Sequence, residues 1–215
     1  AIACVLILGG TSAFGQGFPS RPIRIETGSV GSNGDVISRL VGPTLASGLG
    51  QPVLVENRTS GIILGETVAR SAADGHTLLV TGSSFWLAPF LEQKVPWDPL
   101  RDFAPISLLS TSPNLIVVHP SVPANSVKEL IALIRARPGV LNYASGATGS
   151  APHLAAELFN TMAQVQLVRI NYKGIGPAMN DLIGGQVQVM FPNGGGVVDH
   201  LKSGRLKGLA VTSAK

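Results

Sequence analysis

Glycine and hydroxyl residues gather in four short segments of this sequence where a small anion could bind. The segments are residues 27–35, 82–84, 145–150 and 173–176. Each follows a β-type run and leads into a stretch with helical spacing, so each would place backbone N–H groups at a helix N-terminus, which favours an anion. Glycine and serine also make ordinary turns. Only the four segments together indicate a neutral, hydrogen-bonding site for a small anionic solute.

The candidate binding residues divide between the two halves of the chain. In the first half we expect Asp35 to order its loop and cap its helix, because a carboxylate repels an anion. The other candidates there are Gly31, Ser32, Asn33, Gly34, Ser83 and Ser84, and those of the second half are Thr148, Gly149, Ser150 and Gly174.

Residues that could catalyse a reaction or hold a metal form poor constellations. The sequence has no G-x-S-x-G elbow, no P-loop and no full dinucleotide fingerprint. His153 and Glu157 stand four residues apart on a predicted helix, but nothing supplies a third metal ligand at recognisable spacing. The only cysteine, Cys4, excludes a disulfide within the chain. We therefore predict no metal, no cofactor and no enzymatic activity.

Composition indicates a folded protein with no nucleic-acid footprint. The 215 residues are 45% hydrophobic and 13% charged, which is typical of a compact fold. The net charge is +4 with a pI of about 9.6. The basic residues are scattered singly and form no stripe interleaved with aromatics, which argues against nucleic-acid binding.

Short β-type runs alternate with helical stretches from residue 19 onward. This alternation predicts an α/β fold with parallel sheets covered on both faces, in which ligands bind beyond the carboxyl ends of the strands. Ser126 and Glu129 fit a capping box at the start of a helix that Pro138 and Gly139 end. The predicted strands are residues 23–25, 52–55, 77–81, 106–109, 114–119, 141–144, 167–170, 187–191 and 206–211. The predicted helices are 35–49, 65–71, a short one after 84, 126–137, 152–162, 178–183 and 197–202.

Residues 1–17 resemble the end of a secretion signal. They carry no charge, residues 1–10 are an apolar run of signal-peptide length, and Ala13 and Gly15 are small residues where a signal peptidase cleaves. We interpret this segment as a signal-peptide remnant, which predicts a periplasmic protein. No later run is long and apolar enough to be a transmembrane helix.

Several motifs occur in one order along the chain. They include GQPVLVENR at 50–58, ADGHTLL at 73–79, VPWDP at 95–99, VHPSVP at 118–123, LNYAS at 141–145 and GGQV at 184–187. On these motifs the chain, from residue 18 almost to 215, resembles the Bug-type receptors of the tripartite tricarboxylate transporter family.

The resemblance implies a two-lobed, Venus-flytrap fold of the type II periplasmic-binding-protein class. Such a receptor closes on a small carboxylate solute and passes it to a membrane permease, without a cofactor, and we expect a monomer. The implied division is a signal remnant at 1–17, lobe one at 18–118, lobe two at 119–210 and the start of a return crossing at 211–215. On this comparison we expect the C-terminal part of the first lobe to be missing.

The resemblance also implies further site residues. The family's two carboxylate-gripping loops correspond to residues 30–35 and 146–150, which adds Val30 and Gly146. The Tyr-Lys-Gly loop adds Lys173, and the loop after the next strand adds Asn193. In the first loop, Gly34 stands where the family commonly has a hydroxyl residue.

Two alternatives remain open. The chain could be the effector-sensing domain of a regulator, since such domains use a similar bilobal fold, although no DNA-binding segment precedes Phe18. It could also be an enzyme that acts on carboxylates with His153 as the base.

Overall fold

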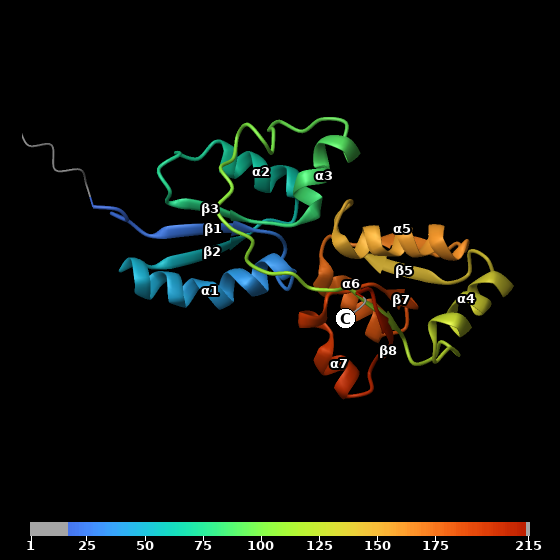
Figure 1. Cartoon of the computed structure of the whole chain (residues 1–215). Helices are drawn as coiled ribbons and strands as arrows, with labels where there is room; N and C mark the ends of the chain where they lie inside the picture. Colours follow the sequence, from blue (N-terminus) through green and yellow to red (C-terminus); the bar gives the residue numbers. More distant parts are fainter. Residues whose placement is uncertain (1–16, 214–215) are drawn as a thin grey trace, which may run out of the picture.

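The computed structural model describes residues 17–213, which fold into two lobes (Figure 1). Residues 1–16, and with them nearly all of the predicted signal-peptide remnant, lie outside the described range. Within residues 17–213, no helix combines the length and the apolar character needed to cross a membrane.

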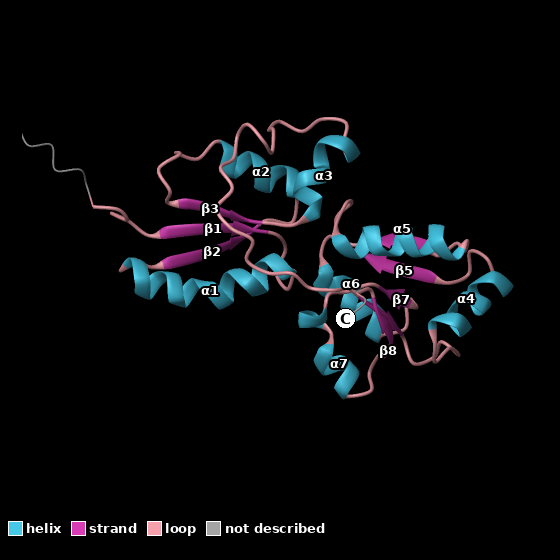
Figure 2. Cartoon of the chain, in the orientation of Figure 1, coloured by secondary structure: helices cyan, strands magenta, loops and turns pink. Residues whose placement is uncertain are grey.

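The first lobe is a small parallel sheet flanked by helices. Its strands follow the order β2-β1-β3, and both neighbours of β1 run parallel to it. Helix α1 lies on one face, and α2 and α3 lie on the other (Figure 2). The elements are β1 (Ile23–Thr27), α1 (Asn33–Leu49), β2 (Val53–Asn57), α2 (Gly61–Ala69), β3 (Thr77–Val80) and α3 (Ser83–Leu91).

The second lobe contains a five-stranded sheet in the order β6-β5-β7-β4-β8. Tyr143 and Phe191 are among its largest fully buried side chains, and their rings meet edge to face. The elements are β4 (Leu115–Val118), α4 (Val127–Ala136), β5 (Asn142–Ser145), α5 (Ala151–Ala163), β6 (Val168–Asn171), α6 (Ile175–Ile183), β7 (Val189–Met190), the 3-10 turn η1 (Gly194–Gly196), α7 (Val198–Lys202) and β8 (Lys207–Val211).

Two expectations about strands were wrong. The sheets are not purely parallel, because β4 runs antiparallel to both β7 and β8. Residues 106–109 form no strand: they belong to the extended connection between the lobes, where Ile106 and Leu108 are exposed. A strand needs a neighbour to accept its backbone hydrogen bonds, and no described strand pairs with this segment.

The boundary between the lobes falls earlier than the predicted residue 118. Strand β4 pairs with β7 and β8, so it belongs to the sheet of the second lobe rather than to lobe one. The rest of the predicted division stays a prediction.

Local capping explains where the main helices begin. Ser126 accepts the N–H of Glu129 at 3.2 Å, and the Glu129 carboxylate accepts the N–H of Asn125 at 2.9 Å, so the predicted capping box forms. Helix α1 starts two residues before the predicted position, because Ser32 is its N-cap and accepts the N–H of Asp35 at 3.3 Å. Its C-cap is Gly50, with φ 66°.

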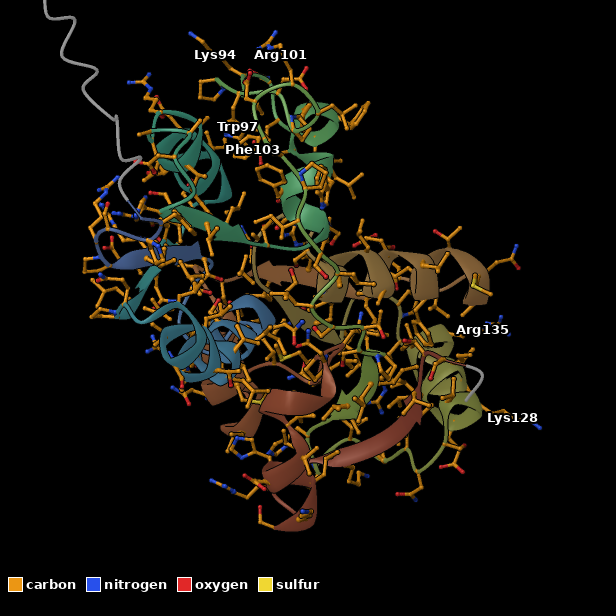
Figure 3. The ribbon with its side chains drawn as sticks, turned by 60° about the vertical axis from the view of Figure 1, so that its left-hand side comes forward. Lys94, Trp97, Arg101, Phe103, Lys128 and Arg135 are labelled. Carbon is orange, nitrogen blue, oxygen red and sulfur yellow. The ribbon has the colours of Figure 1, made fainter. Side chains whose placement is uncertain are left out.

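An aromatic cluster attaches the loop after α3 to the first lobe. The side chains of Trp97 and Phe103 lie close together (Figure 3). Trp97 stacks on Phe85 with ring centroids 4.4 Å apart, and Phe103 lies edge-on to both rings. The Trp97 indole N–H donates to the Ile62 carbonyl at 3.0 Å. A Cβ on Gly65 would lie 2.3 Å from the Trp97 ring, so only glycine permits this packing. Trp97 is therefore a packing residue of the first lobe.

Candidate functional site

Four helix N-termini, two from each lobe, meet where the lobes touch. Helices α1 and α3 follow β1 and β3, which are neighbours in the first sheet, and α5 and α6 follow β5 and β6, which are neighbours in the second. Adjacent strands lie about 4.8 Å apart, so the two helix starts of each lobe lie side by side. The four glycine- and serine-rich segments are the turns into these helices.

Two contacts join these turns across the lobes. The Ser83 hydroxyl donates to the Gly149 carbonyl at 2.9 Å, which connects the start of α3 to the turn before α5. On the neighbouring strands, a Cβ on Gly174 would lie 3.0 Å from the Ser29 hydroxyl, so the turns into α6 and α1 are also in close approach. Ser84 also lies beside Gly149, because a Cβ on Gly149 would be 3.5 Å from the Ser84 Cα. The predicted convergence of the segments is therefore observed.

Asp35 orders the loop before α1, as predicted. Its buried carboxylate accepts hydrogen bonds from the Gly31 N–H, the Asn57 side-chain amide and Arg39, each at 2.9 Å. Burial by itself would raise the pKa of Asp35. The hydrogen bonds from Gly31 and Asn57, together with the charge of Arg39, instead hold its pKa below the usual value. The carboxylate is thus occupied within its own lobe.

The start of α1 leaves backbone donors free. Among the described residues, the N–H groups of Asn33 and Gly34 have no protein acceptor. A Cβ on Gly34 would lie 2.5 Å from the Thr27 hydroxyl and 3.1 Å from the Val80 carbonyl. Glycine is required there because the helix start packs against the ends of β1 and β3. Val30, also in this loop, is 66% exposed.

The turn before α5 presents some donors and uses others internally. Gly149 donates its N–H to the His153 ring nitrogen at 3.1 Å and gives its carbonyl to Ser83, so its backbone is fully used within the protein. The N–H groups of Ala147 and Thr148 have no acceptor within residues 17–213. The buried Ser150 hydroxyl, at the N-cap of α5, also lacks a partner there.

The remaining predicted residues divide between close and distant positions. Gly174, the N-cap of α6, is buried against the first lobe, whereas Lys173 beside it is exposed. The Tyr172 hydroxyl donates to Asp181 at 2.7 Å, which fixes this turn to α6. Asn193 forms an isolated bridge with Asn114, and no side-chain hydrogen bond of Asn193 is present in the described structure.

Arg169 on β6 is the residue of this region that sequence reasoning missed. Its guanidinium donates to Ser145 Oγ at 2.8 Å, to the Gly146 carbonyl at 3.0 Å and to Thr148 Oγ1 at 3.3 Å. The Gly146 carbonyl and the Thr148 hydroxyl are therefore bonded to Arg169 within the second lobe. A lone arginine in a strand gives no signal in the sequence of where its long side chain ends.

His153 and Glu157 do not act as a pair. His153 accepts the Gly149 N–H, and burial first, then the charge of Arg169, lower its pKa, which favours the neutral ring. Glu157 instead accepts the hydroxyl of Tyr143. No group of three potential metal ligands occurs in residues 17–213.

A surface hollow of about 400 Å³ lies elsewhere on the second lobe. Its lining includes Lys207, whose ammonium group already donates to the carbonyls of Val122 and Ala124 and to Asn125. The lysine therefore has no free donor directed at a solute there.

Comparison with known proteins identifies relatives of this chain. The family described as "Tripartite tricarboxylate transporter family receptor" matches residues 37–215. The protein BugT of Bordetella pertussis is 40% identical over 202 residues, covering 92% of this chain and 62% of BugT. The chain thus spans about three fifths of the length of this relative.

Two solved structures with bound acids are similar in fold. The structure of Rpa4515 of R. palustris with adipate superposes with a TM-score of 0.87 at 34% identity, covering 92% of this chain and 68% of that one. MatC from Rhodopseudomonas palustris with bound malate gives a TM-score of 0.84 at 30% identity, covering 92% and 69%. The fold is that of a periplasmic binding protein, and the chain belongs to the tripartite tricarboxylate transporter receptor family.

Proposed function

We propose that this protein captures a small dicarboxylate between its lobes in the periplasm and delivers it to a membrane permease. The observation that carries the proposal is the convergence of four helix N-termini, of which one in each lobe, α1 and α5, has free backbone donors. Asn33 and Gly34 supply them from one lobe, and Ala147 and Thr148 supply them from the other.

The chemistry of these turns suits an acid. Enclosing a carboxylate between two lobes removes its water, which is tolerable only if N–H and hydroxyl groups replace the lost hydrogen bonds. Each helix N-terminus adds a favourable dipole contribution of about 0.3–1 kcal/mol. The buried, unpartnered Ser150 hydroxyl is a further donor at the start of α5.

The size class of the solute follows from relatives. Rpa4515 was solved with adipate and MatC with malate, both at 30% identity or more to this chain. These acids each carry two carboxylates on a short chain. We extend this class to the present protein, together with the periplasmic location and the permease partner that the family description implies.

A thermal-shift screen of the full-length protein tests the binding step. A dicarboxylate at 100 times its dissociation constant should stabilise the folded state by about 2.7 kcal/mol. Adipate and malate are the first probes, with their diamides as uncharged controls. Melting curves that stay flat for every acid would contradict the proposal.

Delivery needs a separate experiment. In cells that lack the gene, uptake of the radiolabelled acid should fall and should return with the wild-type protein. Unchanged uptake in the deletion strain, with binding intact, would limit the function to capture without transport.

A further inference from the structure

Within residues 17–213, Arg169 is the only charged side chain that bonds to the turn between β5 and α5. Its hydrogen bonds reach Ser145 at the end of β5, Gly146 and Thr148 in that turn, and Asn171 on its own strand at 3.2 Å. A guanidinium is planar and its donors have fixed directions. Because several donors bind successive parts of one turn, the guanidinium fixes the turn's orientation and not merely its position.

No carboxylate of the described chain lies within ion-pair distance of this arginine. Each oxygen that accepts from Arg169 belongs to a hydroxyl, a carbonyl or an amide. Within residues 17–213, no carboxylate forms an ion pair with it. A half-buried positive charge therefore remains next to the turn that carries the free N–H groups of Ala147 and Thr148.

The lowered pKa of His153 shows that the charge of Arg169 acts on the start of α5. Burial is the main cause of the lowered pKa of His153, and the positive charge of Arg169 is the next, while Glu157 acts in the opposite direction. The neutral ring accepts the Gly149 N–H. Arg169 thus acts on the turn twice: directly through hydrogen bonds, and indirectly by favouring the form of His153 that holds Gly149.

We propose that Arg169 is a positioning residue of the acid site: it holds residues 145–148 so that the N–H groups of Ala147 and Thr148 face the solute, and its unpaired charge makes the site prefer anions. This inference rests on the proposed function, because it assigns a role within the same site. Arg169 is not required to touch the solute.

The experiment compares Arg169→Gln and Arg169→Lys in the full-length protein, by calorimetric titration with adipate. Glutamine removes the charge, and we expect its affinity for adipate to fall about tenfold or more, which corresponds to 1.4 kcal/mol or more. Lysine keeps the charge but lacks the planar set of guanidinium donors, so we expect a smaller loss of affinity for adipate. Arg205→Gln is the matched control, since Arg205 is exposed and, in the described part of the chain, donates only to Ser203.

A second readout separates the charge from a purely structural role. In NMR titrations of the imidazole, Arg169→Gln should raise the pKa of His153, whereas Arg169→Lys should leave it near the wild-type value. A protein in which arginine served packing alone would show the same His153 titration in both variants.

The outcomes distinguish this inference from the proposed function. If the wild type binds no carboxylate, both fall together. If the wild type binds adipate and Arg169→Gln binds it within twofold, only the role of Arg169 is overturned. If Arg169→Gln does not fold, the comparison is made between Arg169→Lys, which keeps the charge, and Arg169→Met, which does not. Equal losses of affinity for adipate in these two variants would overturn the role of the charge.

Discussion

Removing the Ser83 hydroxyl should weaken solute binding without weakening either lobe. In the structure this hydroxyl donates to the Gly149 carbonyl at 2.9 Å and is the one hydrogen bond between the described lobes that comes from the four turns. A neutral hydrogen bond contributes about 0.5–1.5 kcal/mol net. Because this bond exists only when the lobes are together, Ser83→Ala should lower affinity for a dicarboxylate about 2- to 12-fold.

The assay is calorimetric titration of the full-length protein with adipate, together with a urea melt of the unliganded variant. Ser71→Ala is the matched control, since its hydroxyl also donates to a backbone carbonyl, that of Thr67 at 2.8 Å, but within a single lobe. We expect Ser71→Ala to lower the urea midpoint and leave affinity unchanged. Equal affinities of Ser83→Ala and wild type would refute the reasoning that closure uses this bond.

Three further substitutions test other parts of the structure. Gly174→Val should reduce affinity at least tenfold with little change in melting temperature, because the new side chain meets Ser29 of the other lobe; unaltered binding would contradict this contact. Asp35→Asn should cost about 1–3 kcal/mol of stability at pH 7. Folding lowers the pKa of Asp35, so the stability that its carboxylate contributes is lost as the group is protonated. The difference in free energy of unfolding between Asp35→Asn and wild type, measured by urea melts, should therefore shrink as the pH falls below about 4. Gly34→Ala should destabilise by about 1–3 kcal/mol despite a better helix propensity, since its methyl group meets Thr27, and an unchanged urea midpoint would argue against that close approach.

Local signals predicted most of the elements and the four turns that converge between the lobes. The capping box at Ser126 and Glu129 fixes the start of α4 through hydrogen bonds between residues three and four apart, which sequence spacing reveals directly. The four glycine- and serine-rich turns were also visible, because turn chemistry is local. Their convergence followed from the rule that the carboxyl ends of neighbouring parallel strands share one edge.

Features that depend on long-range partners were not predictable. The direction of β4 is set by β7 and β8, which lie about seventy to ninety residues further on. Residues 106–109 have the composition of a strand but no described partner. Gly149 was expected to bind the solute with its N–H, yet His153 four residues later accepts that hydrogen bond. Arg169 was missed because a strand side chain can reach a neighbouring turn only once the strands have paired.

The most direct measurement is an amide NMR titration of the full-length protein with adipate. The N–H groups of Asn33, Gly34, Ala147 and Thr148 have no acceptor in the described chain. Their signals should shift together and saturate at one adipate molecule per protein. The Gly149 signal, whose N–H already donates to His153, should move less. Shifts confined to one lobe, or centred on the hollow around Lys207, would contradict the proposed grip on the acid by both lobes.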